Sequence, residues 1–299
     1  MGTTYHITVI ADQLPPSDIE QQIDQLLSKV DHSMSTYKKD SEISRFNRSN
    51  VGQQLEISQE FADVLHISRE IWQLSEGAFD PTLGPLVDLW GFGPKATGDL
   101  FPSDQDITAA LKNTGFDGVV LKGLTLTKNK PVALDLSAVA KGYAVDIVSN
   151  YLEMNALPDY LVEVGGEIRV SGFNSEGMPW RVAIEQPQLL SSVNKIVGLT
   201  DMSIATSGDY RNYFERDGIR YSHTIDPRTG KPIDHNLASV TVLIDSCAEA
   251  DAWATAFSVL GAQQSIELAE KLDLAMYMLV RQNDQFIASS SRGFKSYTD

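Results

Sequence analysis

Short connections between strand-like segments restrict the fold of this chain more than any other feature. Asp-Pro-Arg-Thr-Gly at Asp226–Gly230 is a turn signal between two such segments. Strands joined by two to five residues pair as antiparallel hairpins, because a parallel partner needs a longer crossover. Helical patterns are interleaved with these strands, and no repeat or linker interrupts them. The sequence therefore predicts an α+β fold with mixed, largely antiparallel sheets flanked by helices, forming one unit over residues 1–299.

Apolar periodicity and capping signals predict the helices. Ser17 and Glu20 read as a capping box before an apolar stripe. A helix is expected from about Ser58 to Glu76, and Gly77 is its stop signal. Further helices are predicted from 103 onward and at 137–154, 247–259 and 263–272. The intervening residues 77–103 are rich in Gly and Pro, and a connection of that length is usually functional.

Period-two alternation and β-rich composition predict the strands. They are expected at 3–10, 118–127, 132–136, 160–164, 167–171, 180–185, 195–199, 219–225, 239–244 and, as the last strand, 274–280.

Composition excludes several classes of function. The net charge of −16 over 299 residues disfavours non-specific binding to nucleic acid or to an anionic membrane surface. No apolar run is long enough to span a bilayer, so no transmembrane segment is expected. The single cysteine, Cys247, has no disulfide partner and is interpreted as structural. The chain opens in strand-like sequence, so no signal peptide is expected within it.

A strand that runs into a helix carries the densest set of polar residues, Asp135-Leu-Ser-Ala-Val-Ala-Lys-Gly-Tyr-Ala-Val-Asp146. Free amides at a helix N-terminus attract anions, and Lys141 adds a positive charge one turn later. Asp135 can accept hydrogen bonds from a ring N–H or a ribose hydroxyl. The alternative is a helix that Asp135 or Ser137 caps, with Lys141 solvated. No P-loop or GxGxxG motif is present, so a nucleotide would bind by another scheme.

A second polar pair lies in an alanine-rich helical segment. Asp251 and Thr255 are four residues apart, so they share one helix face. A carboxylate and a hydroxyl suit a hard cation such as Mg²⁺. The small apolar neighbours indicate burial, and a buried aspartate needs a partner. That partner is either a metal ion or a backbone, Lys or Arg group.

His223 is the histidine with a candidate role in chemistry. Alternation places Tyr221, His223 and Ile225 on one face of a strand. A histidine there is either a satisfied structural group or a proton carrier lining a pocket. The remaining histidines show no metal-binding spacing. Glycine-bearing segments at Val164–Glu167 and Ala205–Tyr210 are either ordinary turns or places where a ligand approaches the backbone.

The order of these motifs resembles the ApbE family of FAD:protein FMN transferases over essentially the whole chain. The matching segments are MGTxYxI from Met1, MSTY from Met34, SEISRFN from Ser41, GAFDPTLGPLVDLWGFG from Gly77, DLSAVAKGYAVD from Asp135, EVGGEIRVSG from Glu163, IATSGDYRNYF from Ile204, HTIDPRTGKP from His223 and AEADAWATAF from Ala248.

The resemblance implies an enzyme that binds FAD and Mg²⁺ and attaches FMN through a phosphoester to a Ser or Thr of a partner protein. Typical partners are subunits of sodium-pumping quinone reductases and related electron-transport complexes. It implies a metal site at Asp251 and Thr255, with Ala138 offering only its backbone carbonyl. The FAD contacts that it implies are Met1, Tyr37, Ala78, Phe79, Asp80, Asp135, Lys141 and Ile225.

The implied chemistry assigns AMP as the leaving group. His223 is the candidate for accepting the proton of the attacking threonine or for stabilising the transition state. Asp251 is the second catalytic candidate. Phe79 and Trp90 are expected to form an apolar wall for the flavin or the acceptor peptide. Two alternatives remain open: an FAD pyrophosphatase that yields FMN and AMP, and a non-catalytic FAD-binding protein. The resemblance also implies a periplasmic location, with a lipid anchor on the precursor.

Overall fold

The computed structural model describes residues 2–93, 101–186, 193–208, 213–216, 219–283 and 285–297. The chain divides into two compact units, each built from separate stretches of sequence. The first unit comprises residues 1–28, 141–210 and 235–299, and the second comprises 29–140 and 211–234. The single domain predicted for residues 1–299 stays a prediction. No helix in the described part of the chain is long and apolar enough to cross a membrane.

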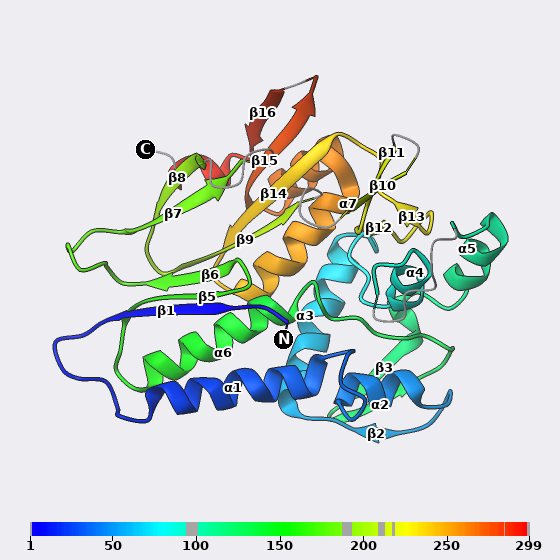
Figure 1. The fold of residues 1–299 in the computed structure, drawn as a ribbon, viewed down its shortest axis with the longest axis horizontal. Helices are drawn as coiled ribbons and strands as arrows, with labels where there is room; N and C mark the ends of the chain where they lie inside the picture. Colours follow the sequence, from blue (N-terminus) through cyan, green and yellow to red (C-terminus); the bar gives the residue numbers. More distant parts are fainter. Residues whose placement is uncertain are drawn as a thin grey trace. The chain divides into compact units, whose positions relative to one another are not determined.

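A seven-stranded sheet forms the centre of the first unit (Figure 1). Every neighbouring pair in it is antiparallel, in agreement with the largely antiparallel pairing that the sequence predicts. In spatial order the strands are β1 (Tyr5–Ile10), β5 (Asp159–Val164), β6 (Glu167–Ser171), β9 (Met202–Gly208), β14 (Leu237–Ile244), β15 (Ala275–Gln282) and β16 (Gln285–Ser290).

Both faces of this sheet are covered. The hairpin of β7 (Trp180–Glu185) and β8 (Val193–Leu199) packs one apolar cluster against Leu243 of β14. Val242 points to the opposite face and is also fully buried. Helix α7 (Cys247–Lys271) packs against β14 and β9 and so covers that second face. The remaining helices of the unit are α6 (Ala140–Met154), the start of α1 (Ile19–Met34) and the 3₁₀-helix η2 (Gly293–Tyr297).

Helices α6 and α7 approach each other closely at Gly142. A Cβ atom on Gly142 would lie 2.1 Å from the carbonyl oxygen of Cys247 and 2.8 Å from the Cα of Ala248. Only a residue without a side chain fits there, and the alanine-rich start of α7 completes the close contact. The alanine-rich segment is buried, as the sequence predicts.

The second unit combines short helices with three small sheets (Figure 1). Trp90 belongs to one of its apolar clusters, and its indole Nε1 donates to the Gly230 carbonyl at 2.8 Å. The helices are α2 (Glu42–Arg48), α3 (Gln59–Leu74), α4 (Gly84–Leu89), α5 (Asp104–Leu111) and η1 (Phe116–Gly118). The strands are β2 (Leu55–Glu56), β3 (Val119–Lys122), β4 (Thr125–Lys128), β10 (Tyr213–Arg216), β11 (Ile219–Ser222), β12 (Ile225–Asp226) and β13 (Lys231–Pro232).

Local signals predict several element ends well. Ser58 caps α3 and Ser103 caps α5, each through its hydroxyl. Gly261 interrupts α7 with a non-helical backbone (φ 75°, ψ 172°), at the predicted break. The turn at Asp226–Gly230 closes the antiparallel hairpin β12–β13.

Other expectations are wrong. The stretch 132–136 forms one isolated bridge, at Ala133, instead of a strand. Helix α1 begins at Ile19. Within the described residues, the Ser17 hydroxyl accepts no hydrogen bond from the first turn of this helix. Strands β9 and β16 were missed: β9 is short of large apolar residues, and β16 lies at a solvent-exposed edge.

The contact at Gly142 predicts a large effect of one methyl group. Gly142→Ala should lower the free energy of unfolding by about 3 kcal/mol, because the methyl overlaps backbone atoms of α7 that have no room to move. Urea denaturation measures this. Gly198→Ala is the matched control, since its Cβ meets nothing closer than Pro179 at 3.7 Å. Equal stability of the two variants would contradict the proposed close contact.

Candidate active site

A lysine bridges two buried carboxylates in the first unit. The Lys141 Nζ lies 3.1 Å from both carboxylate oxygens of Asp251 and 3.1 Å from Oε1 of Glu167. The backbone N–H of Gly142 also donates to Asp251, at 3.2 Å. The partner of the buried Asp251 in this structure is therefore a lysine and a backbone amide, which is one of the alternatives that the sequence left open.

Asp146 fixes where α7 begins and so where Asp251 lies. Its carboxylate accepts from the backbone N–H groups of Cys247 and Ala248, each at 2.9 Å, and from the Ser246 hydroxyl at 3.0 Å. A carboxylate at a helix N-terminus satisfies free amides and faces the positive end of the helix dipole. This cap holds the first turn of α7, and Asp251 follows one turn later with Thr255 another turn on.

A turn of two glycines positions Glu167 at the start of β6. Gly165 and Gly166 connect β5 to β6 with φ angles of 63° and 96°, in the left-handed region that favours glycine. A Cβ on Gly165 would stand 3.2 Å from Cδ of Lys141, so the glycine leaves room for the lysine side chain. Sequence reasoning noted this turn but missed Glu167. The signal available in the sequence was a carboxylate that opens a predicted strand directly after a glycine pair.

The surroundings raise the pKa of both Lys141 and Glu167, but for different reasons. Burial alone would lower the pKa of Lys141, but Asp251 and Glu167 outweigh it and raise that pKa, so the ammonium stays charged. Burial raises the pKa of Glu167 to about 7, although the attraction of Lys141 opposes the rise. Two carboxylates share one ammonium, and the site therefore favours further positive charge.

The donor set fits Mg²⁺. Asp251 offers two carboxylate oxygens, Thr255 a hydroxyl on the same helix face, and both are at least partly buried. Proteins commonly hold Mg²⁺ with one or two carboxylates and leave the other positions to phosphate and water. Within the described ranges, no group of three or more His, Cys, Asp or Glu side chains forms a complete metal cage. The residues therefore suit a cation that a phosphate-bearing ligand helps to bind.

The Asp135 segment lies in the second unit. Asp135 donates its N–H to the Pro81 carbonyl at 2.7 Å, and its carboxylate accepts from the Ser137 N–H at 2.9 Å. The predicted cap at Asp135 and Ser137 is therefore a turn that precedes α6, which begins at Ala140. Ala138 is partly buried in the same turn.

The Ala78–Asp80 segment is a buried turn. Ala78 and Phe79 are 3% and 2% exposed, and Trp90 is 8% exposed. Their side chains therefore present little surface to a flavin, contrary to the expected aromatic wall. Asp80 accepts from the N–H and the hydroxyl of Thr82, at 2.8 and 2.6 Å, and burial raises its pKa against these bonds.

Tyr37, in contrast, is 75% exposed, so its ring is accessible to a flat ligand. Met1 lies outside the described residues. The roles of Tyr37 and Met1 in FAD binding stay predictions.

His223 lies between strands instead of within one. It follows the last residue of β11, Ser222, and precedes β12, which begins at the buried Ile225. Its imidazole is partly buried and meets the ring of Phe92 edge to face at 6.3 Å. A partly exposed imidazole on a short connection is suited to moving a proton.

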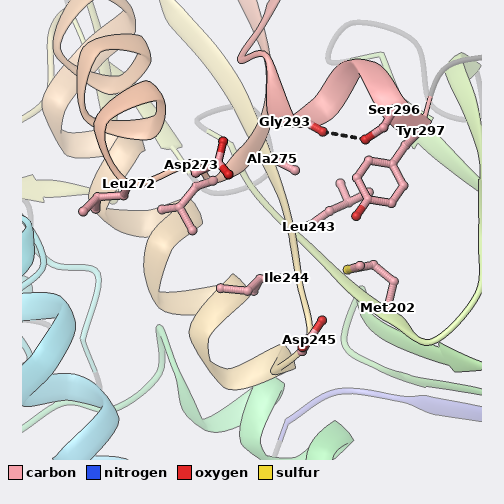
Figure 2. A pocket seen from close by; sticks show the side chains of 11 residues that line it. Met202, Leu243, Ile244, Asp245, Leu272, Asp273, Ala275, Gly293, Ser296 and Tyr297 are labelled. Carbon is pink, nitrogen blue, oxygen red and sulfur yellow. Dashed lines mark hydrogen bonds between the residues drawn. The ribbon is translucent and has the colours of Figure 1, made fainter.

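A separate cleft of about 530 Å³ opens on the first unit. It is lined by residues that flank α7, among them Asp245 before the helix and Asp273 after it, together with Ser296 and Tyr297 (Figure 2). The Ser296 hydroxyl donates to the Gly293 carbonyl at 2.9 Å. None of the predicted site residues lines this cleft, so we assign the candidate chemistry to the Lys141 cluster.

Comparison with known proteins shows the family of this chain. The sequence profile of the ApbE family matches residues 1–278. The chain belongs to the ApbE family. The FAD:protein FMN transferase of Vibrio cholerae is 44% identical, over 99% of this chain and 90% of its own. That of Haemophilus influenzae is 43% identical, over 100% and 90%.

A solved structure of a family member confirms the fold. A histidine-to-glycine variant of the flavin transferase ApbE from Vibrio cholerae superposes with a TM-score of 0.93 at 44% identity, covering 99% of this chain and 96% of that one. The α+β fold that the sequence predicts is therefore that of the family.

The raised pKa of Glu167 predicts a pH dependence of stability. The folded, metal-free protein keeps a proton on Glu167 up to about pH 7, whereas the unfolded chain loses it near 4.5. The free energy of unfolding should therefore fall as pH rises between those values, by about 1.4 kcal/mol per unit of pKa difference at most.

Urea denaturation in EDTA at several pH values tests this expectation against Glu167→Gln. The variant should lack that part of the decline, because its amide does not titrate. Parallel profiles for the two proteins would contradict it.

Proposed function

We propose that this chain is an FAD:protein FMN transferase, which moves the FMN half of FAD onto a Thr or Ser side chain of an acceptor protein in a Mg²⁺-dependent reaction. The name of the curated relatives supports the transferase activity. One observation of the structure carries the proposal. Asp251 is buried, it shares a face of α7 with Thr255, and its carboxylate accepts from the ammonium of Lys141.

In this reaction the acceptor hydroxyl oxygen forms a bond to the flavin-side phosphorus, and the bond from that phosphorus to the bridging oxygen of AMP breaks. AMP leaves with the bridging oxygen and its electron pair. The proton of the hydroxyl passes to a base. His223 is our candidate for that base, because its partly buried imidazole lies on a connection between strands.

The Lys141 cluster, with Asp251 and Thr255, would stabilise the negative charge on the phosphates. When bound, Mg²⁺ supplies positive charge that polarises the phosphoryl oxygens. Asp251 and Thr255 would hold it through oxygen atoms, and the family resemblance adds the backbone carbonyl of Ala138 as a further donor. The Lys141 ammonium, which its neighbouring carboxylates keep protonated, is available to the phosphate charge that develops.

The FAD contacts remain proposals taken from the family resemblance. They are Met1, Tyr37, Ala78, Phe79, Asp80, Asp135, Lys141 and Ile225. Because the Ala78 and Phe79 side chains are buried, we expect their contribution to come from backbone groups. Asp135 offers a carboxylate that already accepts one N–H and has further acceptor capacity.

We also propose that the protein acts in the periplasm, anchored by lipid in its precursor form. The acceptors that we propose are subunits of sodium-pumping quinone reductases or related electron-transport complexes. Cell fractionation of the native precursor checks the location.

Replacement of the candidate metal ligand should abolish labelling. We expect Asp251→Ala to lower the transfer rate at least about 100-fold, because the donor carboxylate is lost and Lys141 loses its main partner. The assay incubates the protein with FAD, Mg²⁺ and a threonine-bearing acceptor domain, and reads intact mass and in-gel flavin fluorescence. Glu267→Ala, an exposed site later on the same helix, is the control.

The same assay separates the alternatives. An acceptor heavier by one FMN, absent in EDTA, supports transfer. Release of AMP and free FMN from FAD with several unlabelled acceptor domains would instead indicate the pyrophosphatase. Intact FAD under all conditions would leave only a binding protein.

His223 should affect rate more than binding. His223→Gln is expected to lower the transfer rate by about 10²- to 10⁴-fold, since a general base typically contributes that much. The dissociation constant for FAD, measured by flavin fluorescence, should change little. His66→Gln, an exposed histidine on α3, is the matched control and should leave both values unchanged. An unchanged rate in His223→Gln would remove this residue from the mechanism.

A further inference from the structure

The Lys141 ammonium has two carboxylate partners of different kinds. It meets both oxygens of Asp251 at 3.1 Å and one oxygen of Glu167 at 3.1 Å. Asp251 is also the candidate metal ligand. A cation bound to the Asp251 oxygens would take the acceptor atoms that the ammonium now uses.

Glu167 is held more firmly than the lysine that it contacts. It is the first residue of β6, it is 4% exposed, and the glycine turn behind it fixes the backbone. Its second oxygen, Oε2, accepts from the N–H of Thr206 on the neighbouring strand β9 at 3.4 Å. The Thr206 hydroxyl in turn bonds that of Thr241 at 2.8 Å, which ties the group into the centre of the sheet.

Lys141, by contrast, has a long flexible side chain with an exposed fraction of 30%. It lies at the start of α6, beside the glycine turn that leaves space for its Cδ. A lysine can therefore shift its ammonium between the two carboxylates without movement of either strand or helix.

We propose that Glu167 is a positioning residue that retains the Lys141 ammonium when the Asp251 carboxylate turns to Mg²⁺. This inference rests on the proposed metal role of Asp251 and assigns to Glu167 a task that acts only through Lys141. Without the glutamate, the ammonium has Asp251 as its remaining carboxylate partner in the cluster and competes with the cation for it. With the glutamate, the lysine stays charged and close to the phosphate-bearing ligand.

Metal binding measured without turnover tests this. Mn²⁺ serves as the probe, because free Mn²⁺ has an EPR signal that is lost on binding. The titration contains FAD but no acceptor protein, and its pH lies above the pKa of about 7 of Glu167, so that this carboxylate is charged. We expect Glu167→Gln to weaken Mn²⁺ binding by about tenfold, the usual cost of losing a group that supports a metal ligand. The Mg²⁺ concentration for half-maximal transfer should rise by the same factor, with little change in the rate at saturating Mg²⁺.

The matched control is Glu153→Gln. Glu153 lies on α6, the helix that carries Lys141, and pairs with a different cation, Arg169, at 3.4 Å. We expect this variant to bind Mn²⁺ as the wild type does. Thermal unfolding of each variant shows whether it folds, and Glu167→Asp, which keeps the charge, should recover part of the affinity lost in Glu167→Gln.

A double-mutant cycle decides whether Glu167 acts through Lys141. In a Lys141→Gln background, Glu167→Gln should cause no further loss of Mn²⁺ affinity, because there is no ammonium left to retain. The same tenfold loss in both backgrounds would overturn the inference, as would equal Mn²⁺ binding by wild type and Glu167→Gln. Absence of Mn²⁺ binding in the wild type would instead remove the metal role of Asp251, and this inference with it.

Discussion

The crossing of α6 over the start of α7 is the contact on which the candidate site depends. Gly142 lets the two backbones approach, and Asp146 caps α7 one turn later on α6. The two contacts fix the rotation and the position of α7 relative to α6. Asp251 then faces Lys141, because Lys141 directly precedes Gly142 on α6 and Asp251 follows the start of α7 by one turn. The lysine and the aspartate that carry the proposed chemistry are thus placed by two residues that take no part in it.

Much of the fold follows from local sequence. Hydroxyl caps at Ser58 and Ser103, the glycine break at Gly261 and the hairpin turn before Gly230 each have a local cause, and the structure contains them. Strand β9 was missed because its sequence, Met-Ser-Ile-Ala-Thr-Ser-Gly, is small and polar, and long-range pairing with β6 and β14 makes it a strand. Tertiary context overrides weak β-propensity there.

The candidate site was predictable in part. Spacing identified Asp251 with Thr255, and a charged lysine after a helix start identified Lys141. Their pairing joins residues 110 apart in sequence, which no local pattern encodes. Glu167 escaped notice because the glycines before it read as a turn. Its burial beside Lys141 is a property of the sheet, and the same holds for the capping role of Asp146.

The interleaving of the two units affects the order in which the chain can fold. Tyr5 of β1 pairs with Val164 of β5, and the stretch 29–140 between them belongs to the other unit. As the chain is made from its N-terminus, the first strand emerges long before its neighbour exists. The second unit likewise waits for residues 211–234. Neither unit is complete until most of the chain has been synthesised, so assembly of this protein is a late and largely collective event.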